Sequence, residues 1–217
     1  MFVLYSYSTK IIIFASMNIN QTETVRWCEN VIIADAEYID KVAFDLTVNF
    51  ERMLGRRIPQ ADLAKWIDCI ALDGGMREGE HETQVIFVRR KGCERLQNFT
   101  PSHFDDEING KAFKDRLGEF SLGSHHAEDM ADKNDFFLDV VRAICSEKEI
   151  RRIMIIPDAE SVYDGVRQAL KDVDEEKRIT LFAMQPMPGG NFRQEILGYS
   201  LMAALGIRGE ELDERGR

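Results

Sequence analysis

The sequence predicts an α/β protein in which helices cover both sides of a mainly parallel sheet of about five strands, a three-layer α/β/α arrangement. Short runs of β-branched apolar residues alternate along the chain with segments of helical periodicity, which is the pattern of a parallel sheet. Two of these runs are apolar at successive positions, as in strands that are buried on both faces. An acidic residue follows each of the two, Asp35 after residues 30–34 and Asp158 after residues 153–157.

The first half of the chain predicts one strand and two helices. The run Asn30–Ala34 is the first strand. Tyr38–Leu54 carries apolar residues at helical spacing and is expected to end at Gly55, because glycine suits the left-handed conformation that closes many helices. A second helix is expected over Ala61–Leu72, after Pro59.

The second half continues the alternation of strands and helices. Strands are expected over Thr83–Val88, Gly118–Leu122, Arg152–Ile156 and Arg178–Met184, and helices over Asp135–Cys145, Ser161–Leu170 and Phe192–Leu205. Asn134 is the expected amino-terminal cap of the first of these helices. His125 and His126 are expected in a polar surface loop, with a metal or acid–base site as the alternative.

A single domain is expected over residues 17–207, because a chain of 217 residues can bury a full-size core without disulfides or structural metals. Residues 1–16 are apolar and aromatic with Lys10 as their only charge, and they precede a second methionine, Met17. We expect them to be an extension from a wrongly chosen upstream start or a disordered segment. A secretory signal is the alternative, although it would need positive charge at its start and a small-residue cleavage site. Residues 208–217 are expected to form a charged tail.

The charge balance and the cysteines limit the partners of the chain. A net charge of -10 and a pI near 5.0 argue against binding of nucleic acid by bulk electrostatics, which leaves the local basic cluster Arg89, Arg90 and Lys91. The sequence has no apolar run that could span a bilayer. Its four cysteines are far apart and form no C-x-x-C pair. We therefore expect a cytoplasmic protein with reduced thiols and no membrane partner.

Acidic residues at strand ends are the candidate metal ligands. Open parallel sheets bind ligands beyond the carboxyl ends of their strands, where the strand order reverses. If the strands before Asp35 and Asp158 are neighbours, these carboxylates converge, with Glu160 close by and Asp135 at the start of a helix. Crowded carboxylates repel one another unless a cation neutralises them, and oxygen ligands favour Mg²⁺ or Mn²⁺. The alternative is that these acids only cap helices and form turns.

Three segments carry a family resemblance: Asn30-Val-Ile-Ile-Ala-Asp-Ala-Glu37, Lys133-Asn-Asp-Phe-Phe-Leu-Asp139 and Ile153-Met-Ile-Ile-Pro-Asp-Ala-Glu160. In type and order they are similar to the NYN branch of the PIN-like nucleases. The resemblance implies a PIN/NYN-like, Rossmann-like fold over roughly residues 30–184. It also implies that Asp35, Asp135 and Asp158 bind the metal and that Glu160 takes the place of a further turn acid.

Two functions are consistent with this resemblance. The first is a metal-dependent ribonuclease or RNA-processing domain, in which the three aspartates hold Mg²⁺ or Mn²⁺, Glu160 helps to position water, and the cluster Arg89, Arg90 and Lys91 contacts the RNA backbone. The alternative is a catalytically inactive interaction or scaffold domain of the same fold, which could form a homodimer. The acidic net charge favours this alternative, as does Ile156-Pro157 where the family has Ser-Gly. Motifs for dinucleotides or for a P-loop are absent from the sequence.

Overall fold

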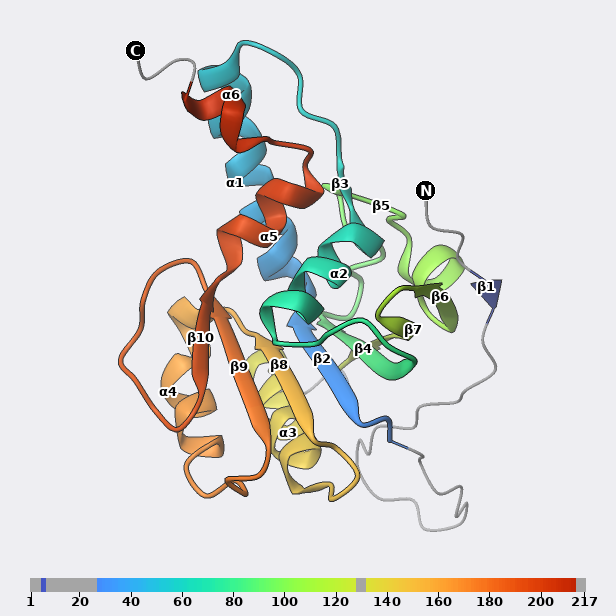
Figure 1. Ribbon diagram of the computed structural model, residues 1–217, viewed down its shortest axis with the longest axis vertical. Helices are drawn as coiled ribbons and strands as arrows, with labels where there is room; N and C mark the ends of the chain where they lie inside the picture. Colours follow the sequence, from blue (N-terminus) through green and yellow to red (C-terminus); the bar gives the residue numbers. More distant parts are fainter. Residues whose placement is uncertain (1–4, 7–26, 128–131, 214–217) are drawn as a thin grey trace.

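The computed structural model describes residues 5–6, 27–127 and 132–213 and is built around an eight-stranded sheet (Figure 1). In sheet order the strands are β1 (Tyr5–Ser6), β6 (Lys111–Asp115), β7 (Gly118–His126), β4 (His81–Arg89), β2 (Asn30–Asp35), β8 (Arg152–Ile156), β9 (Arg178–Ala183) and β10 (Arg193–Ile196). The strands from β7 to β10 in this order are parallel, whereas β6 is antiparallel to both β7 and β1. The α/β class and the mainly parallel sheet are thus confirmed, and the sheet has more strands than expected.

The order of the parallel strands defines one special position in the sheet. Starting from β2, the chain adds β4 and then β7 outward on one side, and later β8, β9 and β10 outward on the other. The order therefore reverses between β2 and β8, which pair directly from Asn30 opposite Arg152 to Ala34 opposite Ile156. A crevice beyond the carboxyl ends of these two strands is where such sheets bind ligands.

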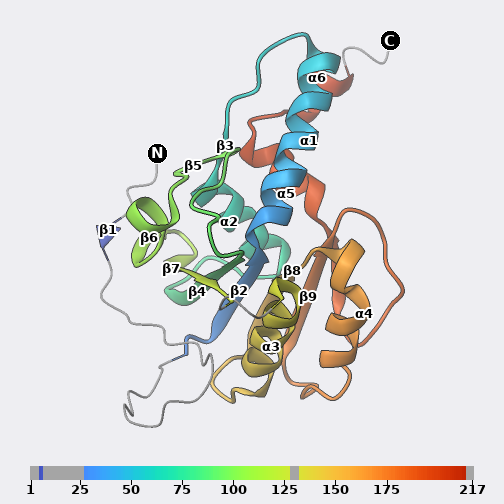
Figure 2. The ribbon, with the colours of Figure 1, turned by 180° about the vertical axis from the view of Figure 1, so that it is seen from behind.

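Helices cover both faces of the sheet. They are α1 (Ala36–Leu54), α2 (Leu63–Asp73), α3 (Lys133–Ser146), α4 (Ala159–Ala169), α5 (Leu197–Ala204) and α6 (Gly209–Asp213). Alternate side chains of β2 belong to different apolar clusters: Ile32 and Ala34 pack with α1, α2 and α5, whereas Val31 and Ile33 pack with α3 and α4. Figure 2 shows α3 and α4 in front of the sheet, and α1 extends past the carboxyl end of β2 toward α6.

The helix ends follow the sequence signals in part. Gly55 closes α1 in the left-handed conformation, with φ 66°, and donates its N–H to the carbonyl of Glu51, as expected. The cap of α3 is Asp132, whose carboxylate accepts the N–H of Asn134 at 2.7 Å. The assignment of Asn134 as the cap was therefore wrong, because the helix begins one residue before it, at Lys133.

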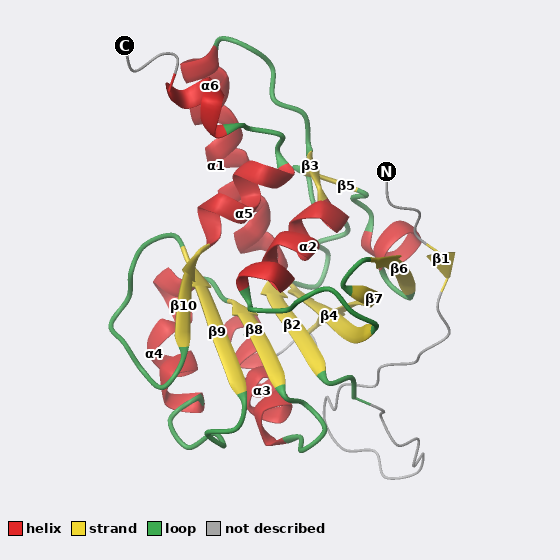
Figure 3. Ribbon diagram, in the orientation of Figure 1, coloured by secondary structure: helices red, strands yellow, loops and turns green. Residues whose placement is uncertain are grey.

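Backbone pairing explains two segments that differ from expectation. β7 continues to His126 because β4 provides hydrogen-bonding partners along its whole length, so His125 and His126 lie in a strand rather than a loop. Residues 193–196, expected in the last helix, pair with the free edge of β9 as β10. Elements without a sequence signal are β3 (Ala61–Asp62), β5 (Phe99–Thr100), the π-helix η1 (Phe104–Ile108) and β6, all visible in Figure 3.

The two predicted end segments are described only in part. The extension predicted over residues 1–16 lies outside the described residues except for β1, which pairs with β6. Within the predicted tail, residues 209–213 form α6, and the remainder lies outside the described part. No disulfide joins the four cysteines in the described part of the chain.

Candidate functional site at the ends of β2 and β8

Asp35 is the last residue of β2 and the cap of α1, so it lies at the position where the strand order reverses. One carboxylate oxygen, Oδ1, accepts the backbone N–H of Tyr38 at 3.0 Å. The side chain is buried, and this burial raises the pKa of the carboxyl group, against the opposing effect of the Lys133 ammonium. Asp35 therefore caps α1, which is the alternative role considered in the sequence. Its Oδ2 remains available for other partners.

Lys133, the first residue of α3, provides that other partner. Its ammonium group donates to Oδ2 of Asp35 and lies 3.6 Å from Oε2 of Glu37. A helix amino terminus repels positive charge, so the two carboxylates, and not the helix, stabilise the ammonium here. Lys133 belongs to the segment that carries the family resemblance, but no local pattern predicts that its charge lies between two acids.

Glu37 completes this buried charge cluster, which we call the lysine-centred cluster: Asp35, Glu37 and Lys133. Oε1 of Glu37 accepts the backbone N–H of Arg90 at 2.9 Å, and the Arg90 guanidinium is 3.5 Å away. Oε2 of Glu37 is buried and has no hydrogen-bond partner among the described residues. Its nearest charge is the ammonium of Lys133, which leaves this oxygen able to accept a further ligand.

Three of the predicted site acids act electrostatically on one phenol, that of Tyr38. Burial, together with the negative charges of Asp158, Glu160 and Asp35, raises the pKa of Tyr38 to about 12. Asp158 caps α4, and its Oδ2 accepts the hydroxyl of Ser161 at 2.8 Å. The direct pairing of β2 with β8 confirms the predicted adjacency of the strands before Asp35 and Asp158. Tyr38, like Glu37 and Lys133, is a site residue that the sequence did not predict.

The fourth predicted acid, Asp135, lies apart from the others. It is exposed on the first turn of α3, and it is not among the charges that shift the pKa of Asp35 or Tyr38. Lys133, two residues earlier, takes the position next to Asp35 instead. Over residues 27–127 and 132–213, no three acidic, histidine or cysteine side chains are arranged so that they could hold one metal ion.

The basic cluster after β4 divides into an internal and an external part. Arg89 is buried, donates to the carbonyl of Cys93 at 2.9 Å and to Asp105 at 3.2 Å, and lies over the ring of Phe104. Its guanidinium therefore ties the loop after β4 to the π-helix. Arg90 and Lys91 are exposed, and Arg90 borders the lysine-centred cluster.

His125 extends the row of strand-end residues away from β8. In the sheet register Val88 of β4 lies between it and Asp35. Burial, together with the charges of His126 and Arg89, lowers the pKa of His125 to about 4, so the imidazole is neutral at pH 7. Its Nε2 is buried without a hydrogen-bond partner in the described part of the chain.

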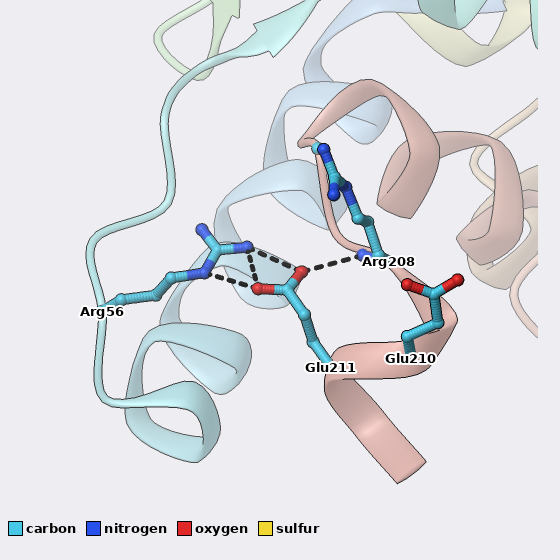
Figure 4. A pocket seen from close by; sticks show the side chains of 5 residues that line it. Arg56, Arg208, Glu210 and Glu211 are labelled. Carbon is cyan, nitrogen blue, oxygen red and sulfur yellow. Dashed lines mark hydrogen bonds and ion pairs between the residues drawn. The ribbon is translucent and has the colours of Figure 1, made fainter. Parts of the chain in front are cut away.

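A polar cavity of about 330 Å³ lies at the opposite end of α1, between α1 and α6 (Figure 4). Arg56 donates through Nε and Nη2 to the two carboxylate oxygens of Glu211, each at 2.9 Å. Glu211 also accepts the backbone N–H of Arg208 at 3.0 Å, and these contacts lower the pKa of its carboxyl group. Two arginines and two glutamates, Glu210 being the second, line the cavity, so their formal charges balance.

Comparison with known proteins identifies a family but no activity. Residues 24–212 match the model of a family described as a Family of unknown function (DUF6621), and the chain belongs to this family. No curated protein and no solved structure matches the chain. None of the helices in the described ranges is long and apolar enough to cross a membrane.

Proposed function

We propose that this member of the DUF6621 family is a metal-dependent ribonuclease or RNA-processing domain with a PIN/NYN-like fold. The observation that carries the proposal is the position of Asp35 and Asp158, which follow neighbouring parallel strands at the point of strand-order reversal. Glu160 adds its negative charge to theirs in raising the pKa of Tyr38. Acids gathered beside a buried carboxyl group with a raised pKa, that of Asp35, are typical of a functional site.

The chemistry of the donor groups suits a hard divalent cation such as Mg²⁺ or Mn²⁺, since every candidate donor is an oxygen. The ammonium of Lys133 already serves as a stand-in cation between two of the acids, and Oε2 of Glu37 has no hydrogen bond among the described residues. In this proposal Asp35 and Asp158 would bind the cation after their side chains rearrange, because no three such groups in the described residues are arranged for it as they stand. When bound, it would activate water and offset the charge that develops on a phosphodiester.

The chain's own residues supply the remaining roles. Glu160 helps to position water, and Arg90 and Lys91 contact the phosphate backbone of RNA at the edge of the site. Arg89 is excluded from such contacts by its burial. Asp135, exposed on the same helix turn as Lys133, has no part in cation binding in this proposal.

Thermal unfolding with and without Mn²⁺ tests the proposal. A ligand that binds only the folded state raises the melting temperature by mass action. We expect a rise for the wild-type protein that Asp35→Asn and Asp158→Asn each abolish. The exposed Asp139→Asn on α3 is the matched control and should leave the rise intact. Cleavage of a single-stranded RNA panel by the same variants then tests the activity, and absence of any Mn²⁺ response would refute the proposal.

A second function, an inactive interaction or scaffold domain of the same fold, is favoured by one observation. The ammonium of Lys133 donates to the very carboxylate oxygen of Asp35 that a metal would need. If this contact is permanent, the lysine replaces the metal and the site is purely structural. The wild-type protein would then show neither a Mn²⁺-dependent rise in melting temperature nor cleavage of RNA.

A further inference from the structure

We infer that the amino-terminal ends of β8, β9 and β10 form a binding site for a phosphate group. Its donors are the guanidinium groups of Arg152, Arg178 and Arg193, which we call the arginine row. The site goes beyond the proposed function and uses none of its acids. The five residues of β8 separate it from Asp158 by roughly 15 Å, at the opposite edge of the sheet.

The register of the sheet brings the arginine row to one face. Arg152 of β8 is paired with Arg178 of β9, and Arg193 of β10 is paired with Thr180, two residues further along β9. Residues two apart in a strand point to the same side, so the three side chains share the face that α2 and α5 cover further along the strands. In Figure 1 no helix lies in front of these strand ends.

Two of the guanidinium groups converge beside Gly75, just after the end of α2. A Cβ placed on Gly75 would lie 3.1 Å from Nη1 of Arg152 and 3.3 Å from Nη1 of Arg193. The two nitrogen atoms are therefore no further apart than the sum of these distances, and the oxygens of a single phosphate can bridge such a separation. Gly75 has no side chain to fill the space between them.

The positive charges of the arginine row repel one another. Burial and the charges of Arg178 and Arg193 lower the pKa of Arg152, whereas Glu29 raises it. Glu195 accepts a hydrogen bond from Nη2 of Arg193 at 2.8 Å. Burial and Glu195 raise the pKa of a third nearby acid, Asp73, although Arg193 lowers it. A bound anion would reduce the repulsion that these acids leave between the three arginines.

Capping of α2 explains only part of the arrangement. Nη1 of Arg152 donates to the carbonyl of Gly74 at 2.7 Å, and its Nε donates to Oδ1 of Asn30 at 3.3 Å, so this arginine also ties the end of α2 to the sheet. Among the described residues, Nη2 of Arg152, Nη1 of Arg193 and the whole guanidinium of Arg178 have no hydrogen-bond acceptor. Planar guanidinium groups with free N–H donors match the geometry of phosphate.

Isothermal titration calorimetry of the full chain, in EDTA and at constant ionic strength, tests the site. One probe is inorganic phosphate, and the other is a single-stranded 2′-O-methyl oligoribonucleotide without terminal phosphates. We expect the wild type to bind at least one probe saturably. Arg178→Gln should raise the Kd of that probe at least about tenfold, because it removes a charge-assisted hydrogen bond. The matched control Arg167→Gln, an exposed arginine of α4 at the other face of the sheet, should leave the Kd unchanged.

The two probes distinguish the sources of the phosphate group. Binding of inorganic phosphate with the expected loss in Arg178→Gln supports a small phosphorylated ligand, and binding of the oligonucleotide with the same loss supports the backbone of RNA. Absence of saturable binding of both probes overturns the inference, as does a Kd that Arg178→Gln leaves unchanged or that Arg167→Gln raises equally. Because EDTA removes divalent cations, none of these results decides the Mn²⁺ test of the proposed function.

A second measurement uses the wild-type protein and so does not depend on the folding of a variant. Phenylglyoxal labelling, quantified by mass spectrometry, reports the accessibility of each arginine with and without the probe that binds. We expect a saturating concentration of this probe to slow the labelling of Arg178 and Arg193 severalfold and to leave that of Arg167 unchanged. Unchanged rates for Arg178 and Arg193 would overturn the inference.

Discussion

The two ends of α1 hold ion pairs of the same chemical kind in opposite environments. At the amino end, the side chains of Lys133 and Asp35 are only 10% and 2% exposed. At the carboxyl end, those of Arg56 and Glu211 are 38% and 31% exposed, although their bidentate geometry is the more regular. Burial, rather than hydrogen-bond geometry, therefore decides how much the free energy of unfolding depends on each pair. Solvent screens the exposed pair, whereas each buried charge depends on its partner.

The buried ion pair of Asp35 and Lys133 is a weak source of stability by itself. Desolvation raises the pKa of Asp35, and Lys133 only partly offsets this effect. An apolar pair of similar volume often stabilises a fold as well as a buried ion pair does. Charges at a strand-order reversal, with a buried Glu37 oxygen that has no hydrogen bond among the described residues, are consistent with the ligand-binding role proposed above.

The largest expected effect comes from breaking the buried pair. Lys133→Met should lower the free energy of unfolding by about 3 kcal/mol in the absence of divalent cations, because it leaves Asp35 charged and buried without a partner. Urea denaturation at pH 7 measures the change. The double variant Asp35→Asn/Lys133→Met should recover part of the loss. A loss below about 1 kcal/mol would mean that this pair behaves like a surface one.

A smaller effect should come from His125, the buried base in the same strand-end row. Its pKa is lowered from 6.5 to about 4, so as the pH falls the unfolded chain takes up a proton before the folded chain does. The stabilising contribution is complete above pH 6.5 and is lost as the pH falls toward 4. Between pH 7 and pH 5 it should decrease by about 2 kcal/mol.

Urea denaturation of the wild type and His125→Gln at both pH values isolates this contribution, because other titrating groups are common to both proteins. The variant should lose less stability than the wild type between pH 7 and pH 5. Equal losses would show that the folded protein protonates His125 as readily as the unfolded chain does.

A third region contains a pair of half-buried acids, Asp68 and Asp115. Burial and a hydrogen bond to Asp115 raise the pKa of Asp68 to about 6. Its contribution to stability is therefore present below the unfolded pKa of 3.8 and is lost as the pH rises through 6. Because Asp68 is partly exposed, Asp68→Asn should raise the stability at pH 7.5 by only about 1 kcal/mol, and by less at pH 5. Melting curves at the two pH values check the sign, which an unchanged or lower melting temperature at pH 7.5 would contradict.

The sequence predicts the central strands well because their apolar runs are buried on both faces, as at Val31 to Ala34. It also predicts Asp35 and Asp158 as strand-end residues. It fails where a partner far away in the chain decides the outcome. Residues 193–196 become β10 only because the edge of β9 is free, and β7 reaches His126 only because β4 is as long.

The same limit applies to the site. The sequence places Lys133 and Asp135 on one helix turn, but nothing local tells which of the two will meet Asp35, because that depends on how α3 docks on the sheet. Periodicity cannot show that the charges of three acids act on Tyr38, since Asp158 and Glu160 lie more than a hundred residues further along the chain. Nor can periodicity show that Arg89 is buried whereas Arg90 is exposed.

The smallest expected effect completes the comparison at the exposed end of α1. Glu211→Gln removes one charge from the pair with Arg56 and should lower the stability only slightly, because both side chains remain in contact with water and the amide still accepts hydrogen bonds. Urea denaturation at low salt and at 0.5 M NaCl measures it, and the cost should shrink at high salt because the Debye length falls to a few ångströms. Lys133→Met should keep most of its cost under the same conditions, because its ion pair is buried. Equal salt dependence at the two ends of α1 would contradict the conclusion that burial separates them.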